Sequence, residues 1–154
     1  MEETPIYIEL ACLRIGTTHF AVDLMRIREI LVPQKLSPLP GTSDLLEGVI
    51  NLRGTVIPVM NMRKRFGMPV MDEVSAGKLL VVSLVGQLLA LAVEDVMEVI
   101  SVPVSEIKPP IQNVSGVGME FLLGVCLSQD RVFMILDIDS LLRNQNYEQS
   151  IEFQ

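Results

Sequence analysis

The sequence predicts a mainly β fold in which one small structural unit occurs twice. Apolar residues make up 49% of the chain, and most are Leu, Val, Ile and Met in short runs, which favour strands. The run from Gly48 to Val59 joins two apolar segments through Asn-Leu-Arg-Gly, a pattern typical of a β-hairpin. A weaker copy runs from Gly124 to Leu136. We therefore expect an all-β chain with a few short helices.

Length and charge restrict the class of protein. The 154 residues suit one domain over residues 4–145, made of halves 4–76 and 77–145 and followed by a polar tail at 146–154. The net charge of −7 disfavours nucleic acid as a partner, because nucleic-acid binding needs a cationic surface. The N-terminus has no secretory signal pattern, and no apolar run is long enough to cross a bilayer. We expect a cytoplasmic protein.

The first elements are predicted to be strands. Residues Ile6–Ile15 alternate as a strand does, and a turn at 16–18 precedes a second strand around Phe20–Val22. The next segment is compatible with a helix, because Leu24, Ile27 and Leu31 have helical spacing. We prefer a short turn at Leu24–Arg26 and a strand from Ile27, because Val32-Pro33 closes the run.

Helix signals flank the hairpin. Thr42 or Ser43 could cap a short helix over Asp44–Glu47 that ends at Gly48. Pro58 lies inside the second hairpin strand, which predicts an edge strand or a bulge. Asn61 could cap another short helix over Met62–Phe66, and residues 71–77 resemble a solvated connector.

The second half repeats this order of elements. Strands are predicted at Lys78–Leu84, Leu88–Val93, Leu123–Leu127 and Val132–Ile138, and Asp139 is predicted to cap a helix that ends at Arg143. Between them, Val96 and Glu98 match Ile27 and Glu29, 69 residues earlier. The order of elements, more than the identities, indicates a duplication.

The chain contains no recognisable catalytic or metal-binding pattern. His19, the single histidine, falls in a turn signal, where an exposed residue is expected. Cys12 and Cys126 lie in apolar segments, as small buried hydrophobic residues or, less simply, as a disulfide pair. Glu94-Asp95 suits a charged turn better than an acid–base pair. We therefore expect no enzyme activity, no metal and no cofactor.

A few charged residues remain as candidates for binding. Glu29 and Glu98 are either solvated positions or the rim of an apolar patch that contains Ile27 and Val96. Arg53 is either a charge in water at the hairpin tip or a clamp on Glu29 or on the Asn51 carbonyl, and we favour the clamp. The basic run at residues 63–65 is expected to form a solvated helix face rather than an anion site.

Three segments together resemble the CheW family of chemotaxis coupling proteins. They are Phe20-Ala21-Val22-Asp23 with Ile27, Glu29 and Ile30, the hairpin Gly48–Val59, and Arg63-x-Arg65-Phe66-Gly67. The resemblance extends from about Ile6 to Leu142. Asn61 and Glu94 stand where the family usually has Asp, but each keeps an oxygen that can accept a backbone N–H.

The resemblance implies two five-stranded β-barrels around a shared core and a non-enzymatic adaptor. Such an adaptor joins the cytoplasmic tip of a methyl-accepting chemoreceptor to the regulatory domain of the histidine kinase CheA. A receptor helix would lie in the groove between the barrels, near Ile27, Glu29, Val49, Asn51, Val96 and Glu98. Gly48, Arg53 and Gly54 would support the hairpin, and Met62 and Phe66 would contact the kinase.

Two other functions are compatible with the same residues. One is a coupler of a non-flagellar pathway, such as twitching or gliding motility, which would share every feature above. The other is a small-ligand module or enzyme on a β-barrel, which would require a concave polar pocket.

Overall fold

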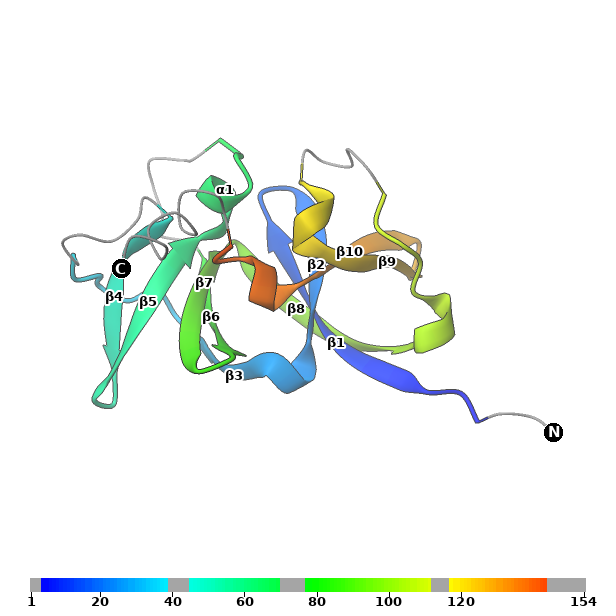
Figure 1. Ribbon diagram of the computed structural model, residues 1–154, viewed down its shortest axis with the longest axis horizontal. Helices are drawn as coiled ribbons and strands as arrows, with labels where there is room; N and C mark the ends of the chain where they lie inside the picture. The colour runs from blue at the N-terminus through cyan, green and yellow to red at the C-terminus, as the bar shows by residue number, and fades with distance from the viewer. Residues whose placement is uncertain (1–3, 39–44, 70–76, 112–116, 144–154) are drawn as a thin grey trace.

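The computed structural model describes residues 4–38, 45–69, 77–111 and 117–143, and its structure is almost entirely β (Figure 1). The ten strands within these ranges are β1 (Tyr7–Ile15), β2 (Thr18–Asp23), β3 (Ile27–Leu31), β4 (Leu46–Leu52), β5 (Thr55–Asn61), β6 (Lys78–Leu84), β7 (Gln87–Val93), β8 (Asp95–Pro103), β9 (Leu122–Ser128) and β10 (Arg131–Leu136). The helical elements are one α-helical turn, α1 (Met62–Arg65), and the 3₁₀ turns η1 (Leu24–Arg26), η2 (Val104–Glu106), η3 (Met119–Phe121) and η4 (Ile138–Ser140). The prediction of an all-β chain with short helices is confirmed.

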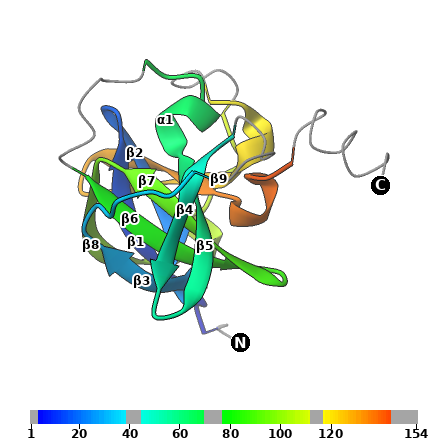
Figure 2. The ribbon, with the colours of Figure 1, turned by 90° about the vertical axis from the view of Figure 1, so that its left-hand side faces the viewer.

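The strands form two five-stranded sheets with the same internal order. Sheet A has the order β8-β1-β2-β10-β9, and sheet B has the order β3-β6-β7-β5-β4. Each sheet thus consists of an edge strand, a central hairpin and a second hairpin, which is the duplication that the sequence indicates. Figure 1 shows the sheets side by side, and Figure 2 views the molecule from the side of sheet B.

The halves of the sequence do not correspond to the two sheets. Sheet A takes β1 and β2 from the first half and β8, β9 and β10 from the second, and sheet B has the reciprocal composition. The expected division into one barrel at residues 4–76 and another at 77–145 is therefore wrong. The reason is that the two halves exchange hairpins. The β1–β2 hairpin of the first half joins the strands of the second half in sheet A, and the β6–β7 hairpin of the second half joins the strands of the first half in sheet B.

The sheets are also not closed barrels, because each keeps two edge strands in its hydrogen-bond order. The chain that leaves one edge strand instead returns to the opposite edge. Ser37, after β3, exchanges two backbone hydrogen bonds with Val49 of β4, at 2.9 and 2.8 Å. Lys108, after β8, does the same with Val125 of β9. These bridges narrow the opening between the two edge strands of each sheet, which a closed barrel would not have.

Two glycines allow this close approach. A Cβ atom on Gly48 would lie 2.6 Å from the carbonyl oxygen of Ser37, and one on Gly124 would lie 2.6 Å from that of Lys108. Any side chain would push the bridging segment away from the strand. The repeated glycine of the sequence thus serves the same contact in both sheets.

The core consists of three clusters. One lies between the sheets and draws side chains from both, including Phe20 and Met134 of sheet A and Leu80 and Leu91 of sheet B. Each of the other two is built on one sheet alone, the second on sheet A and the third on sheet B. Neighbouring residues along β6 alternate between clusters: Leu80 and Val82 face the shared core, whereas Leu79 and Val81 face the core of sheet B. The central strands are thus buried on both faces, which explains their unbroken apolar runs.

Several local predictions are confirmed. Residues 24–26 form a 3₁₀ turn before β3, and the Asp23 side chain accepts a hydrogen bond from the Met25 amide. The Asn61 side chain caps α1 by accepting from the amides of Arg63 and Lys64. Asn61 therefore supplies the oxygen that this position requires.

Two local predictions are wrong. Leu46 and Glu47 begin β4 instead of ending a helix, because Leu46 pairs with Met60 of β5; the proposed caps at 42 and 43 lie outside the described residues. Pro58 is neither on an edge strand nor at a bulge, since β5 lies between β4 and β7 and the register shift of this ladder falls between Leu46 and Gly48. The strand accommodates this proline because its pairing with β7 begins only at Val59.

The glycine contact leads to a stability prediction. Gly124→Ala should lower the free energy of unfolding by about 1–3 kcal/mol, because the new methyl group overlaps the Lys108 carbonyl. Leu123→Thr, at the exposed neighbouring position, should change it by no more than about 0.5 kcal/mol. Urea unfolding of the two variants checks this. Equal stability of both would contradict the role assigned to the bridge.

Candidate interaction surface

The β4–β5 hairpin has a tight turn that presents Arg53. Arg53 and Gly54 have φ values of +50° and +87°, as expected of the mirror-image turns that suit two-residue hairpins. The Asn51 side-chain oxygen accepts a hydrogen bond from the Gly54 amide at 2.9 Å. Arg53 is a non-glycine residue in the left-handed region, so the turn holds it in a conformation that costs backbone energy.

Arg53 binds Glu29 through two hydrogen bonds. Its two terminal nitrogens donate to the carboxylate oxygens at 2.5 and 3.3 Å. The hydrogen bond from Arg53 lowers the pKa of Glu29, and the same bond raises the pKa of Arg53. This ion pair connects β3 to the β4–β5 hairpin, so it spans the open side of sheet B. The prediction of a clamp is confirmed.

The Arg53–Glu29 pair contributes more to arrangement than to stability. The Arg53 side chain is 72% exposed, and exposed ion pairs stabilise proteins little. Its structural effect is to hold the hairpin tip and the Glu29 carboxylate in one place.

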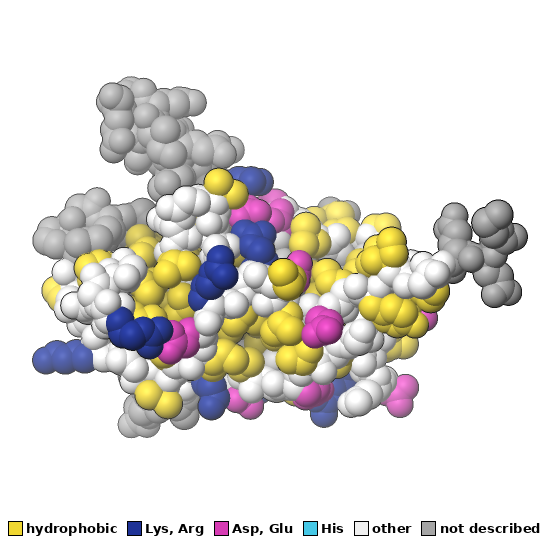
Figure 3. Space-filling view, turned by 90° about the horizontal axis from the view of Figure 1, so that it is seen from below, with side chains coloured by type: hydrophobic (Ala, Val, Ile, Leu, Met, Phe, Trp, Pro, Cys, Tyr) yellow, Lys and Arg dark blue, Asp and Glu magenta, His cyan; other side chains and the backbone are white. Residues whose placement is uncertain are grey.

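Ile27 and Val96 occupy equivalent positions in the two sheets. Ile27 begins β3 and Val96 lies near the start of β8, and both are half-buried against the shared core. Exposed apolar side chains occur on these two strands, at Ile30 in β3 and Val99 in β8, and at Met25 in η1, the turn before β3. Figure 3 shows the side of the molecule seen from below, where hydrophobic side chains are interspersed with charged ones.

The remaining candidates are placed less uniformly. Glu98 is exposed on β8, on the sheet opposite Glu29. Val49 is half-buried on β4, at the outer edge of sheet B, where its backbone is bonded to Ser37. The structure thus brings Glu29 together with Arg53 and the hairpin turn held by Asn51, and places Ile27 and Val96 on the edge strands next to the shared core. It does not bring Val49 to the boundary between the sheets.

Met62 and Phe66 do not fit a surface contact. Met62 is 0% exposed and Phe66 is 8% exposed. The Phe66 ring stacks on Phe20 at 5.5 Å between centroids and lies 5.4 Å from Phe121. The expectation that these two side chains contact a kinase is therefore wrong, because both are part of the shared core.

Arg26 connects three elements near the edge strand β3. Its Nε donates to the Ser83 carbonyl at the end of β6, at 2.8 Å. Its terminal nitrogens bind the Asp139 carboxylate in η4, at 2.5 and 3.2 Å. The hydrogen bond from Arg26 lowers the pKa of Asp139. Asp139 was expected to cap a helix; it pairs with Arg26 instead, and η4 ends at Ser140.

All three residues of the basic run have partners. Arg63 pairs with Glu94, which also accepts a hydrogen bond from the Gly16 amide at 2.6 Å. Lys64 pairs with Glu47 at 2.6 Å. The prediction of a solvated helix face holds for Lys64, which is exposed, but is wrong for Arg63 and Arg65, which are half-buried beside the one-turn helix.

Arg65 contributes to this packing. It donates to the carbonyls of Leu141 and Arg143, each at 2.6 Å, and its guanidinium lies 4.3 Å from the centre of the Phe121 ring. Burial lowers the pKa of Arg65. Local sequence carried no signal for these hydrogen bonds, because the two carbonyls lie 76 and 78 residues away from Arg65.

The residues that could have supported catalysis occupy structural positions. Cys12 and Cys126 are buried and unbridged, and burial raises the pKa of the Cys12 thiol to about 12. His19 is half-buried in β2 with its ring edge-on to Phe133, so the expected exposed turn residue is wrong. No group of three or more His, Cys, Asp or Glu residues that could hold a metal occurs within the four described ranges. The helices of this part of the chain are all too short to cross a membrane.

Comparison with known proteins gives a consistent result. The family model described as a CheW-like domain matches residues 9–146. A chemotaxis protein CheW of Treponema pallidum is 26% identical over 91% of this chain and 85% of its own length. Protein FrzA of Myxococcus xanthus is 32% identical over 76% of this chain and 72% of its own length. The crystal structure of the scaffolding protein TtCheW from Thermoanaerobacter tengcongensis superimposes with a TM-score of 0.82, at 26% identity and over 94% of each chain.

The Arg26–Asp139 pair should couple the two residues energetically. A double-mutant cycle with Arg26→Ala and Asp139→Asn should give a coupling of about 0.5–1 kcal/mol at neutral pH, since both side chains are about one-third exposed. Because the folded-state pKa of Asp139 is lowered, this coupling should persist above the ordinary aspartate pKa and disappear as the pH falls through the lowered value.

The Lys64–Glu47 pair provides a matched control, because Lys64 is more exposed and the pair is joined by one contact at 2.6 Å. Its cycle should give a smaller coupling. A coupling for Arg26 and Asp139 no larger than that of the control would show that the pair does not tie η1 to η4.

Proposed function

Because this chain belongs to the CheW-like family, whose members are scaffolding or adaptor proteins, we propose that it couples chemoreceptors to a CheA-type histidine kinase. In this role the protein catalyses no reaction. It transmits the state of the receptor by holding receptor and kinase in one geometry, in the cytoplasm beneath the membrane that carries the receptors. The match over nearly the whole chain supports the adaptor role.

The observation that carries the receptor contact is the Arg53–Glu29 clamp beside half-buried Ile27. The clamp fixes a carboxylate next to an aliphatic side chain on the edge strand of sheet B, and Val96 and Glu98 repeat this combination on the edge strand of sheet A. We assign the receptor helix to this surface, with apolar contacts to Ile27 and Val96 and charged contacts at its rim. Asn51, Gly48 and Gly54 support the hairpin. Val49 supports it from β4, where its backbone is bonded to Ser37.

The kinase contact is assigned to the ends of the sheets. A regulatory domain of similar fold could stack on such an end, and repeated stacking of this kind favours closed rings.

A coupler of a non-flagellar pathway is the second candidate. Protein FrzA, the Myxococcus xanthus relative, is 32% identical to this chain yet carries a different name from the CheW relatives. The same clamp and edge strands would serve in either pathway.

Charge reversal tests the receptor assignment. Glu29→Arg and Arg53→Glu should each weaken binding of a receptor cytoplasmic fragment by about tenfold, because each breaks the clamp and reverses a charge at the rim. The double variant restores an ion pair with the opposite polarity, so the hairpin should re-form while receptor binding stays weak. Titration calorimetry measures binding, and amide exchange at Gly54 reports on the hairpin.

Glu106→Arg is the control, because Glu106 is exposed in η2, the turn that follows β8 of sheet A. It should bind the receptor fragment normally. Unchanged binding by both single variants would place the receptor site elsewhere. Full recovery of binding in the double variant would show that the pair is only a structural clamp.

A further inference from the structure

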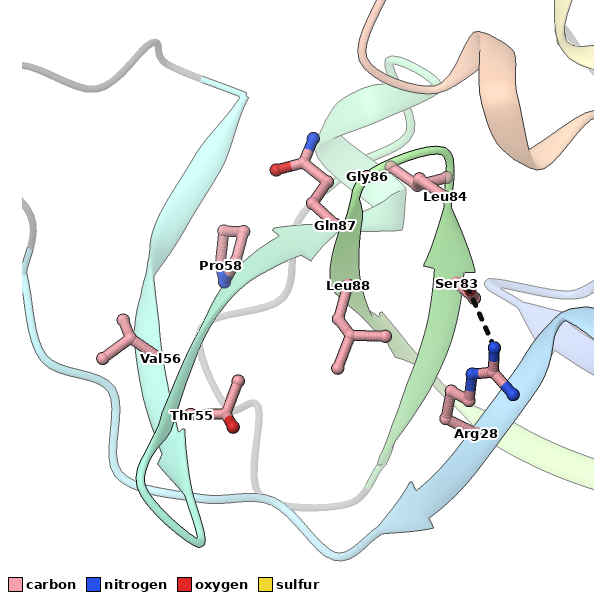
Figure 4. A pocket seen from close by; sticks show the side chains of 9 residues that line it. All are labelled: Arg28, Thr55, Val56, Pro58, Ser83, Leu84, Gly86, Gln87 and Leu88. Atoms are coloured by element: carbon pink, nitrogen blue, oxygen red, sulfur yellow. Dashed lines mark hydrogen bonds between the residues drawn. The ribbon is translucent and has the colours of Figure 1, made fainter.

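Strands β5 and β7 run together for only part of their length. Their parallel pairing covers Val59–Asn61 and Ala90–Ala92, and towards Thr55 and Gln87 the strands diverge. A cavity of about 500 Å³ lies at these diverging ends and extends to β6 and β3. It is lined by Arg28, Thr55, Val56, Pro58, Ser83, Leu84, Gly86, Gln87 and Leu88, which Figure 4 shows on β3, β5, β6 and β7. We call this space the notch.

Residues from both faces of sheet B line the notch. On β5, Val56 and Pro58 lie on the face opposite to Ile57 and Val59, which point into the core of sheet B. On β7, Leu88 packs against that same core, yet it also lines the notch. A gap in the ladder accounts for both observations.

One wall of the notch carries main-chain groups of β5 that are not bonded to β4. The N–H and C=O of Val49 both bond to Ser37, so the Val49–Pro58 pair exchanges no hydrogen bonds across β4 and β5. Antiparallel pairs alternate, so the Asn51–Val56 pair exchanges none either. The N–H and C=O of Val56 therefore point away from β4 and towards the notch, whereas the Pro58 carbonyl belongs to the β5–β7 ladder that begins at the Val59–Ala90 pair.

The opposite wall carries the same kind of groups on β7. The two-residue turn of the β6–β7 hairpin makes Leu84–Gln87 a hydrogen-bonded pair, so the next pair, Ser83–Leu88, is not bonded. The N–H and C=O of Leu88 thus also point into the notch. In the described part of the chain, the β5–β7 ladder starts beyond both Val56 and Leu88.

The side chains around the notch are aliphatic, with one cation at the rim. Val56 is 62% exposed, and Leu88 and Pro58 are half-buried. Arg28 is the one charged residue among those that line the notch, and it lies exposed across the opening, with one contact of 3.5 Å to the Ser83 hydroxyl. The side of its guanidinium that does not face Ser83 is available to a carboxylate.

We propose that the notch binds an extended segment of a partner protein that carries an acidic side chain among aliphatic ones. The segment would pair its backbone with Val56 and Leu88, as in strand addition, pack its aliphatic side chains on Val56 and Pro58, and place its carboxylate at Arg28. This site goes beyond the proposed coupling function, because none of the residues that line the notch is among those assigned to the receptor, although Arg28 lies between Ile27 and Glu29 on β3.

Amide hydrogen exchange of the ¹⁵N-labelled protein tests the premise and the binding together. In the free protein the amides of Val56 and Leu88 should exchange much faster than those of Ile57 and Leu89, which face paired strands. The probe is an acetylated and amidated Thr-Val-Glu-Val-Thr peptide. At about ten times its Kd, it should slow exchange at Val56 and Leu88 by about tenfold.

Two peptide controls separate the possible occupants. The same peptide with alternate amides N-methylated, in both registers, should not protect Val56 or Leu88, because it cannot complete the ladder. Equal protection by the methylated peptides would overturn strand pairing and indicate a pocket for side chains or small molecules. Equal protection of Val56 and Ile57 in the free protein would show that the notch is closed and would also overturn the proposal.

Variants of the protein test the two contacts separately. Val56→Pro should abolish peptide binding, because proline has no N–H to donate to the peptide. It should keep the hairpin folded, because position 56, like that of Pro58, is not hydrogen-bonded to β4. Arg28→Glu should weaken binding of the glutamate peptide and strengthen binding of a Thr-Val-Lys-Val-Thr peptide. Arg131→Glu, an exposed arginine at the start of β10 in sheet A, is the control and should bind like the unmodified protein. No change in either test variant would overturn the site.

Discussion

The core between the two sheets is built from side chains that neither half of the chain supplies alone. Phe20 and Met134 reach it from sheet A, and Leu80 and Leu89 reach it from sheet B, each of them no more than 2% exposed. Full burial of one such side chain contributes about 1.5–3 kcal/mol, so this cluster is a major part of the stability of a small domain. The exchanged central hairpins make each sheet depend on the other half of the chain.

Polar contacts around this core fix how the sheets are held. Arg26 joins η1 to β6 and to η4, and Glu94 joins α1 to the turn after β1. The edge strands β3 and β8 therefore start from anchored positions on opposite sheets. An adaptor that must hold two partners in one geometry requires sheets that are fixed relative to each other. The notch in sheet B lies where β5 and β7 are not paired.

The sequence predicted local structure well where the signal was local. The Asn-Leu-Arg-Gly hairpin, the turn before Ile27 and the Asn61 cap all depend on residues within a few positions of one another, and all three are confirmed. The Glu29–Arg53 clamp joins residues 24 positions apart. It could still be anticipated, because few carboxylates were available as partners for an arginine at the hairpin tip.

Other features could not be obtained from the sequence, because they depend on which strands become neighbours. The exchange of hairpins between sheets leaves no mark on hydrophobic patterns, so the halves were assigned to separate barrels. The burial of Phe66 could not be predicted from local pattern, because a helix of one turn gives too few residues to define a buried face. Asp139 was assigned as a cap because its partner, Arg26, lies 113 residues away.

Native-state hydrogen exchange on Leu89→Ala tests the central claim most directly, which is that the shared core makes the two sheets one cooperative unit. Leu89 belongs to sheet B but faces this core. The account predicts that amides of β2 in sheet A and of β6 in sheet B lose the same opening free energy, about 3 kcal/mol. A loss confined to sheet B, with β2 as protected as before, would contradict it.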